Sequence, residues 1–421
     1  MKQNYLPRVA DKALDAALEA SGAELVEGAK WCGKTRTAHE KAASTLFMQD
    51  PDQSAAYLKA AATKPSLLLR GATPRLLDEW QMAPVLWDAV RFAVDERGER
   101  GQFILTGSAV PTDNATQHTG TGRISRFLMR PMSLFESQES TGEIALGALF
   151  DGQKEVEGLS SLTIERLAFA LARGGWPAAI GANAHVALRQ VYDYVEAVIN
   201  VDVSRVDGIE KNPARVRALL RSLGRNVSTL ATIGTIRGDM ATDEASISEK
   251  TISQYINALR RIFVVEDLPA WSPALRSKTA LRTSRKRQFV DPSIAAAALR
   301  ATPERLLGDF NTFGSLFESL CIRDLRVYAG AIDGEVFYYQ DKAGLEADAI
   351  VQLKDGRWGA VEVKMGAGEI DAAAQNLQKL QAKINVEKMQ PPVFLMVLTG
   401  TELAYRRADG VLVVPIGCLR A

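Results

Sequence analysis

The chain has 421 residues, of which 47% are hydrophobic and 24% charged, and its formal net charge is +1. This length points to about two to four domains of ordinary globular composition. The near-neutral charge excludes a global field that would draw the protein to nucleic acid or membrane, so such binding must come from local patches. There is no signal-type apolar segment at the start and no run of the ~18 apolar residues that a membrane span needs, so we expect a cytoplasmic protein. The three cysteines lie too far apart in sequence to predict a disulfide framework or a zinc site.

A glycine-rich loop follows the first expected strand, residues 23–27, and precedes an expected helix over residues 34–48. Residues 28–35 read Gly-Ala-Lys-Trp-Cys-Gly-Lys-Thr, a full G-x-x-x-x-G-K-[ST] match. In such a loop the backbone N–H groups face a β-phosphate, the lysine reaches the β and γ oxygens, and the hydroxyl binds Mg²⁺. The alternative is a plain glycine turn. The pattern predicts ATP or ADP with Mg²⁺ as cofactors, bound by Gly28, Lys30, Cys32, Gly33, Lys34, Thr35 and Arg36.

Two further segments match the other half of a hydrolytic nucleotide site. An apolar run at residues 66–70 is followed by Leu-Leu-Asp-Glu, which places Asp78 to hold the metal through water and Glu79 to polarise the attacking water. The expected strand over residues 103–108 ends in small polar residues, and Thr106 or Ser108 is suited to position that water. A surface acidic pair and ordinary strand-end capping are the alternatives.

Residues 118–136, with the loop and residues 77–81, resemble the bacterial and archaeal AAA+-like P-loop ATPases that carry a C-terminal domain of unknown function. Residues 5–8 and 174–177 fit the same resemblance. It implies a homo-oligomer, a hexamer being one candidate, in which each site receives a catalytic arginine from a neighbouring subunit. Arg123 is the first choice for this arginine and Arg126 the second, and a solvated surface arginine is the alternative for either.

The middle of the chain is expected to be helical. After a lid with helices over residues 161–173 and 186–203, a winged helix is predicted from helices at 215–223, 229–236 and 248–263 and a basic hairpin at 276–287. Ser246 and Glu249 give a capping signal for the third helix. The alternative is a winged helix used for protein contacts. The expected DNA contacts are Lys250, Gln254, Arg276, Lys278, Arg282, Arg285, Lys286 and Arg287.

The final third resembles the PD-(D/E)xK endonuclease-like fold. Residues two apart on a strand share a face, so Glu362 and Lys364 are expected to point into one site. The resemblance implies that Asp348 and Glu362 hold Mg²⁺, that Glu318 completes the metal shell, and that Lys364 orients water. Ala347 stands where such motifs usually have proline. The alternative is a fold retained for DNA binding, branched DNA included, after catalysis is lost.

The sequence therefore predicts an α/β protein in four segments. They are an AAA+-like parallel-sheet ATPase core (1–140), a helical lid (141–207), a winged-helix domain (208–290) and an endonuclease-like domain (291–421). The expected function is Mg²⁺-dependent ATP hydrolysis coupled to engaging or remodelling DNA, junction-like DNA included. The alternatives are a nucleotide-dependent switch that binds a protein partner and an ATP-gated nuclease.

Overall fold

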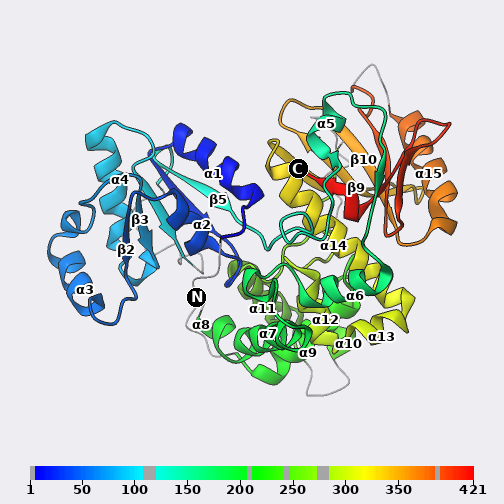
Figure 1. Ribbon diagram of the computed structural model, residues 1–421. Coiled ribbons are helices and arrows are strands. Elements are labelled where there is room, and N and C mark those ends of the chain that lie inside the picture. Colours follow the sequence, from blue (N-terminus) through cyan, green and yellow to red (C-terminus); the bar gives the residue numbers. More distant parts are fainter. Residues whose placement is uncertain (1–4, 108–119, 206–210, 241–246, 273–283, 385–388) are drawn as a thin grey trace. The chain divides into compact units, whose positions relative to one another are not determined.

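The structure is a computed structural model that describes residues 5–107, 120–205, 211–240, 247–272, 284–384 and 389–421 (Figure 1). The predictions for Ser108, Ser246, Arg276, Lys278 and Arg282 lie outside these residues. The chain divides into two compact units. The first comprises Met1–Pro131, Val201–Glu210 and Ala258–Phe263, and the second comprises Met132–Asn200, Lys211–Asn257 and Val264–Ala421. The four-segment division made from the sequence stays a prediction.

A five-stranded parallel sheet forms the centre of the first unit. Its strands stand in the order β2-β3-β4-β1-β5, and every neighbouring pair is parallel. The carboxyl ends of all five strands therefore meet at one edge, the usual place for a ligand in such sheets. The apolar run at residues 66–70 begins in a 3-10 turn (Pro65–Leu67), and the strand that leads to Asp78 starts at Arg75. The strands are β1 (Ala23–Glu27), β2 (Ser44–Phe47), β3 (Arg75–Asp78), β4 (Phe103–Thr106) and β5 (Ile124–Leu128).

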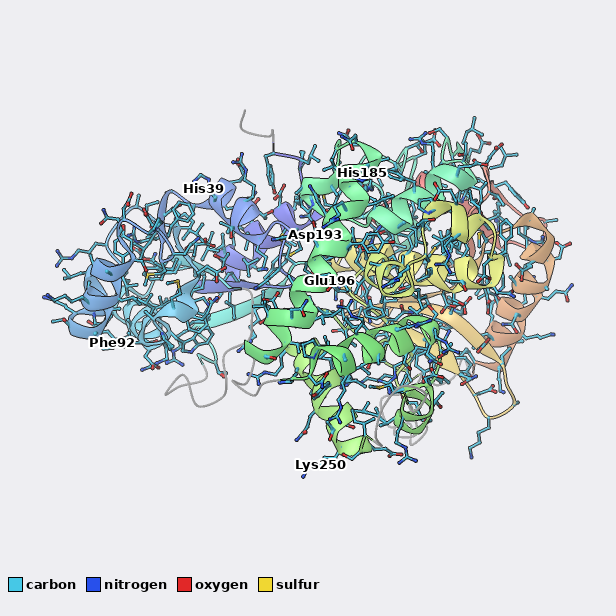
Figure 2. The ribbon with its side chains drawn as sticks, turned by 90° about the horizontal axis from the view of Figure 1, so that it is seen from below. His39, Phe92, His185, Asp193, Glu196 and Lys250 are labelled. Atoms are coloured by element: carbon cyan, nitrogen blue, oxygen red, sulfur yellow. The ribbon has the colours of Figure 1, made fainter. Side chains whose placement is uncertain are left out.

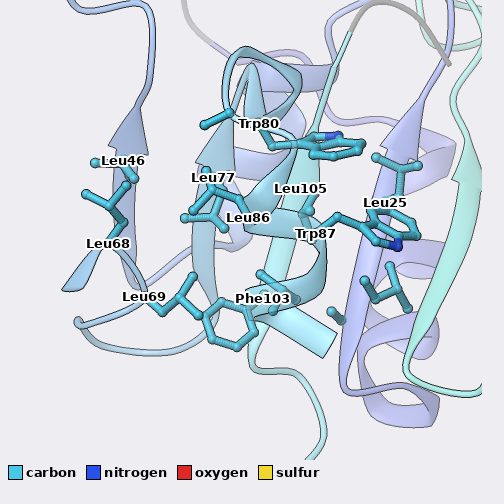
Figure 3. Packing of buried hydrophobic residues seen from close by; sticks show 14 of the residues in the cluster. Leu25, Leu46, Leu68, Leu69, Leu77, Trp80, Leu86, Trp87, Phe103 and Leu105 are labelled. Carbon is cyan, nitrogen blue, oxygen red and sulfur yellow. The ribbon is translucent and has the colours of Figure 1, made fainter. Parts of the chain in front are cut away.

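Helices cover both faces of this sheet. On one face, α3 (Ser54–Thr63) and α4 (Val85–Arg97) bury a continuous apolar cluster that includes Leu25, Leu77 and Leu105 from three strands (Figure 3). Because strand side chains alternate, the neighbours of these leucines face the opposite side. There α1 (Val9–Ala20) and α2 (Lys34–Lys41) pack through residues such as Leu14 and Ala38. The rigid packing fixes the loop between β1 and α2 at the carboxyl edge.

The second unit contains a set of packed helices. They include α6 (Ile164–Arg173), α7 (Ala184–Ala197), α9 (Pro213–Arg225), α10 (Ile233–Met240), α12 (Pro292–Leu299) and α13 (Pro303–Leu307). Side chains at their starts accept backbone N–H groups, as Thr163 does for α6, Asn183 for α7 and Asn212 for α9, which explains where these helices begin. A π-helical turn (Val198–Asp202) and α11 (Glu249–Arg261) each contain residues of both units, and α8 (Val203–Arg205) belongs to the first unit.

A mixed seven-stranded sheet completes the second unit, in the order β7-β12-β13-β11-β10-β9-β8. The long helix α14 (Phe310–Gly330) contacts β8, β9 and β10, and α15 (Ile370–Lys383) buries its apolar residues in a cluster with β9, β10, β11 and Val413 of β13. A short parallel pair joins β6 (Ile144–Ala145), ahead of α5 (Leu146–Phe150), to β14 (Leu419–Arg420). The sheet strands are β7 (Gly158–Leu159), β8 (Gly334–Gln340), β9 (Glu346–Leu353), β10 (Trp358–Lys364), β11 (Leu395–Thr399), β12 (Leu403–Arg406) and β13 (Leu412–Pro415).

These elements confirm the predicted α/β class, with a parallel sheet first and helical and sheet-containing parts after it. Among the described helices, none is both long and apolar enough to cross a bilayer.

Candidate functional site

The loop between β1 and α2 has the backbone of a phosphate-binding loop. Gly28, Trp31 and Gly33 all have positive φ angles, of 147°, 66° and 103°. A side chain at Gly28 would place its Cβ 2.1 Å from the backbone oxygen of Met129, so only glycine fits there. The chain curls at these residues and delivers Lys34 and Thr35 to the first turn of α2. At that helix start, free N–H groups favour an anion.

Lys34 and Thr35 lie at the carboxyl edge of the sheet, where the sequence predicts the phosphates. The Lys34 ammonium is buried and donates to the backbone oxygens of Gly28 and Ala29, at 2.8 and 2.7 Å. Both acceptors are neutral carbonyls of the loop itself. The charge of Lys34 is therefore available to phosphate oxygens, which compete well against a neutral carbonyl.

Asp78 is the point at which the strands β3 and β4 and the helix α2 meet. Its Oδ1 accepts from Thr35 Oγ1 at 2.8 Å and from Thr106 Oγ1 at 2.5 Å, and its Oδ2 accepts from Gln49 Nε2 at 2.6 Å. Asp78 is 1% exposed. The structure thus brings together three residues predicted from separate segments, and it adds Gln49, which the sequence reasoning missed.

The oxygens at this point suit a magnesium ion. Mg²⁺ prefers hard oxygen ligands, and it is usually held by one or two protein groups together with substrate phosphates and water. The Thr35 hydroxyl and the Asp78 carboxylate are such ligands, and they already lie within hydrogen-bond distance of each other. The residues present therefore fit the ion that the sequence predicts.

Glu79 follows Asp78 directly and takes up a left-handed backbone conformation, with φ of 56°. Its carboxylate accepts a hydrogen bond from Gln81 Nε2. Burial raises the pKa of the Glu79 carboxyl above its ordinary value, and the neighbouring charge of Asp78 raises it further. A raised pKa makes a carboxylate a stronger proton acceptor, which suits a group that activates water.

The other predicted loop contacts have different surroundings. Lys30 Nζ pairs with Asp202 Oδ1 at 2.5 Å, and Asp202 lies 172 residues further along the chain. Cys32 is buried, with its thiol 3.5 Å from the backbone oxygen of Met129. Arg36 pairs with Glu40 at 2.6 Å on the exposed side of α2. Cys32 can therefore contact a ligand only through its backbone N–H. Lys30 and Arg36 can contact a phosphate only if they leave their ion pairs with Asp202 and Glu40.

Arg8 is a structural support for the loop that the sequence reasoning noted only as part of a family match. It is 6% exposed, and its guanidinium donates to the backbone oxygens of Cys32 at 2.8 Å and Arg130 at 2.9 Å. Tyr5 completes this anchor, because its hydroxyl donates to Asp11 and contacts Thr37 of α2. Through Tyr5 and Arg8, the segment before α1 thereby ties the loop and α2 to Arg130, which follows β5.

The two candidate trans arginines lie on or beside β5. Arg123 contacts Asp95 at 2.8 Å, and its backbone oxygen accepts from Ala23 N–H at the start of β1. That is the edge of the sheet opposite the loop, roughly 16 Å away along a five-residue strand. Arg126 contacts Glu27 at 3.0 Å, beside the end of β1. Both side chains are nearly half exposed, at 45% and 47%.

The four residues predicted for the nuclease-like centre come together in the second unit. Glu318 projects from α14, Asp348 from β9, and Glu362 and Lys364 from β10. Lys364 Nζ lies 3.2 Å from Glu362 Oε2 and 3.8 Å from Asp348 Oδ2. This part of the constellation forms as the strand alternation predicts.

A fifth residue, Lys286, occupies the middle of this centre. Its Nζ lies 3.0 Å from Glu318 Oε1 and 3.5 Å from Asp348 Oδ1, and it faces the Tyr338 ring. Burial lowers the pKa of Lys286 because it disfavours the ammonium charge. The negative charges of Glu318 and Asp348 raise this pKa by more, so the net shift is upward. Burial and the nearby Asp348 also raise the pKa values of Glu318 and Glu362, each to about 8.

Lys286 takes the space beside Glu318 and Asp348 in this arrangement, which does not fit a metal ion there. The prediction that Glu318, Asp348 and Glu362 hold Mg²⁺ stays a prediction. Asp348 Oδ2 also accepts from the Val363 N–H at 2.8 Å, and Glu362 Oε1 accepts from Asn376 at 2.7 Å. Within the described part of the chain, no three acidic, histidine or cysteine side chains converge in a way that could hold a metal. The ammonium of Lys286 supplies the positive charge that the carboxylates need.

Comparisons with known proteins agree with the two halves of this description. An AAA domain model matches residues 21–138, and a domain of unknown function, DUF4143, matches residues 313–419. These matches place an AAA-type domain at the start of the chain and a DUF4143 domain at its end. Another domain of unknown function, DUF8612, matches residues 164–305 between them.

The chain is also similar to proteins of solved structure. The Walker-type ATPase PABY2304 of Pyrococcus abyssi is 14% identical, with 70% of this chain and 97% of that chain covered and a TM-score of 0.41. No curated protein matches the chain.

The basic residues expected on a wing divide into buried and exposed ones. Lys286 and Arg287 are buried, which corrects the expectation that they face phosphates. Antiparallel bridges join Lys286 to Leu268 and Phe289 to Val265, and Lys286 contacts Glu318 and Asp348 of the DUF4143 domain. Arg287 pairs there with the buried Asp267 at 3.0 Å.

Other predicted DNA contacts do lie at the surface. Arg285 is exposed, and Lys250 and Gln254 are exposed one turn apart on α11, where Figure 2 labels Lys250. The helices α9, α10 and α11 and the two bridges follow the order of a winged helix. The winged-helix assignment itself stays a prediction.

Proposed function

We propose that the AAA domain binds ATP with Mg²⁺ at Gly28–Thr35 and hydrolyses it. The observation that carries this proposal is the convergence of Thr35 and Thr106 on the buried Asp78, beside Lys34 and Glu79. A loop used only to bind nucleotide has no need of a buried carboxylate followed by a second one with a raised pKa.

Each residue has a role that follows from its position. Lys34 leaves the loop carbonyls for the β and γ oxygens, and backbone N–H groups after Gly28 surround the phosphates. Thr35 and Asp78 would hold Mg²⁺, which offsets phosphate charge. Glu79 accepts the proton of the attacking water while Gln81 keeps its carboxylate in place, and Thr106 fixes Asp78 from β4.

The experiment is a phosphate-release assay on the full chain with Mg²⁺. Lys34→Ala is expected to abolish turnover because the β and γ oxygens lose their cation. Lys41→Ala, on the same helix but paired with Asp15 away from the loop, is the matched control and should keep wild-type turnover. Turnover that survives Lys34→Ala would place hydrolysis elsewhere.

The proposal extends to a homo-oligomer in which Arg123 or Arg126 completes the neighbour's site. Its support is that both guanidinium groups are nearly half exposed and that Arg123 lies on the far edge from its own loop. Mixing inactive Lys34→Ala subunits with inactive Arg123→Ala or Arg126→Ala subunits should restore part of the ATPase rate. Mixtures that stay inactive, in assemblies shown to exchange subunits, would contradict a shared site.

A second proposed function is engagement of DNA by the second unit. The exposed side chains of Lys250, Gln254 and Arg285 support it, since a near-neutral protein can bind nucleic acid only through such local sites. The rival proposal, a switch for a protein partner, predicts ATP turnover that no DNA alters. Comparing the ATPase rate with single-stranded, duplex and four-way-junction DNA separates them.

An ATP-gated nuclease has less support from the structure than the other two functions. Lys286 occupies the place among Glu318 and Asp348 that a catalytic metal would need. Supercoiled plasmid should therefore stay intact with ATP and Mg²⁺ or Mn²⁺. Cleavage that Asp348→Ala abolishes would restore the nuclease reading.

A further inference from the structure

Two adjoining cavities lie within the helices of the second unit. One has a volume of about 520 Å³ and is lined by residues of α7, α9 and α12, with Arg305 of α13. The other has a volume of about 490 Å³ and lies between α9, α13 and the start of α14. They share the lining residues Arg221, Leu299 and Arg305 and therefore adjoin, and we call the two together the arginine groove.

The charges that line the arginine groove are strongly unbalanced. The lining includes two carboxylates, Glu196 and Asp309, against six arginines, which are Arg215, Arg217, Arg221, Arg225, Arg300 and Arg305. Glu196, labelled on α7 in Figure 2, forms a two-point ion pair with Arg217. Clustered cations of this kind repel one another, so a bound anionic ligand would reduce the repulsion among the arginines.

Three of these arginines are open to such a ligand. Arg221, Arg225 and Arg300 are exposed, and in the described ranges of the chain none of them has a carboxylate within ion-pair distance. A guanidinium presents a planar fork of donors that matches phosphate geometry, which lysine does not. All six groove cations are arginine, and phosphate is therefore the best matched anion.

The spacing along α9 indicates a polymer of phosphates. Arg221 and Arg225 are four residues apart on α9, so they share one face about 6 Å apart, and Arg300 at the end of α12 lines the same groove. One strand of a duplex carries a phosphate about every 3.4 Å along the axis, so the pair on α9 faces about two phosphates. A chain of phosphates offers a partner to each of the three arginines.

The floor of the groove suits the rest of a nucleotide chain. Tyr192, Leu220 and Leu299 line the larger cavity beside the arginines. Aromatic and apolar side chains next to a cationic track are what single strands use to stack bases while their phosphates meet the cations. The apolar floor and the cationic rim therefore favour the same ligand class, a nucleic acid strand.

We propose that the arginine groove binds the sugar-phosphate backbone of nucleic acid. The inference rests on the proposed engagement of DNA and names the surface responsible for it. The groove is lined by residues of α7, α9, α12 and α13 and by the start of α14. Arg221, Arg225 and Arg300 contact successive phosphates, and Arg305 is held in place by a hydrogen bond to the Arg300 backbone oxygen.

The test compares two triple variants of the full chain that lose the same charge. The groove variant is Arg221→Gln/Arg225→Gln/Arg300→Gln. The control variant is Arg166→Gln/Arg189→Gln/Arg406→Gln, which removes three exposed arginines of the same unit that do not line the groove. Binding of labelled single-stranded and duplex DNA is measured across a salt series, and ATP turnover without DNA is measured in parallel.

The expected result is a loss of at least tenfold in DNA affinity for the groove variant, with basal ATP turnover unchanged. The slope of log Kd against log salt should fall by about 2 to 3, as expected for three lost phosphate contacts. The control variant should keep the wild-type slope. Equal slopes for the groove variant and the wild type would contradict DNA binding by the arginine groove, but they would not contradict DNA binding elsewhere on the second unit.

Two other outcomes are informative. A wild-type protein that hydrolyses ATP but binds neither DNA would overturn DNA engagement and this inference together. Mononucleotide binding to a Lys34→Ala protein, lost in the groove variant while DNA binding is kept, would overturn the polymer assignment.

Discussion

Replacing Lys286 by methionine tests how the centre of the DUF4143 domain is stabilised. The substitution keeps the length of the side chain and removes one buried ammonium from between Glu318 and Asp348. The lysine is 6% exposed and its charge lies 3.0 and 3.5 Å from these two carboxylates. In the variant, Lys364 is the remaining cation in contact with Asp348 and Glu362.

The magnitude follows from those distances. At an effective dielectric of about 20, each of the two contacts attracts with roughly 5 kcal/mol, most of which offsets the cost of burying the charges. Removing one partner of a buried ion pair typically costs about 3 to 5 kcal/mol. Glu318 has a raised pKa and takes up a proton with little resistance, so we expect the lower end, about 3 kcal/mol.

Urea unfolding followed by tryptophan fluorescence measures this change, since Trp271 and Trp358 lie in the apolar core of the domain. Lys250→Met is the matched control, because Lys250 is exposed, and its effect should stay within about 0.5 kcal/mol. A change below about 1 kcal/mol for Lys286→Met would refute the reasoning, because the ammonium would then not stabilise the carboxylates.

The same lysine decides whether the centre takes a metal. Nucleotide-free Lys286→Ala, with room where the ammonium was, should bind Mn²⁺ by calorimetry, and adding Asp348→Asn should remove that binding. Wild-type protein should show none at this centre. Mn²⁺ binding by the wild type that Asp348→Asn abolishes would contradict the assignment of Lys286 as the resident cation.

Two further predictions concern the AAA domain. Burial raises the pKa of Glu24 to about 7, above its unfolded value of about 4.5. The folded state therefore holds this proton more tightly, and stability is lost as pH rises through that window. In urea unfolding, Glu24→Gln should raise the free energy of unfolding by about 2 kcal/mol over wild type above pH 7 and should leave it unchanged near pH 4. Glu19→Gln, exposed on α1, is the control. A gain for Glu24→Gln that does not depend on pH would contradict the raised pKa of Glu24. Arg8→Ala should weaken ATP binding about tenfold by loosening the loop at Cys32, and an unchanged Kd would show that the anchor is dispensable.

The sequence predicts those site residues that belong to a short pattern of neighbouring residues. The loop at 28–35, the Asp78-Glu79 pair and Thr106 each follow from a short pattern on a strand or at its end, and parallel strands bring such ends together. Glu362 and Lys364 follow from strand alternation in the same way.

The parts that the sequence misses depend on contacts distant along the chain. Lys286 and Arg287 read as a basic wing, because a run of cations gives no sign that bridges to Leu268 and Val265 will bury it. The pairing of Lys30 with Asp202 and the anchoring of Cys32 by Arg8 likewise need a folded backbone. A signal for Arg8 did exist, since it closes a short tract shared with the resembling family.

The arginine groove was missed for a related reason. Its arginines come from α9, α12 and α13, and no single segment of them is basic enough to stand out beside the run at 276–287. The spacing of Arg217, Arg221 and Arg225 was the available signal, because residues four apart on a helix share a face.

ATP turnover by Glu79→Gln tests the central claim most directly, because the substitution removes the proton acceptor and leaves the loop intact. With Mg²⁺, the account predicts that the hydrolysis rate falls by about 10²- to 10⁴-fold while the Kd for ATP stays near that of the wild type. Turnover close to the wild-type rate, with ATP still bound, would contradict the assignment of Glu79 and of this edge of the sheet as the hydrolytic site.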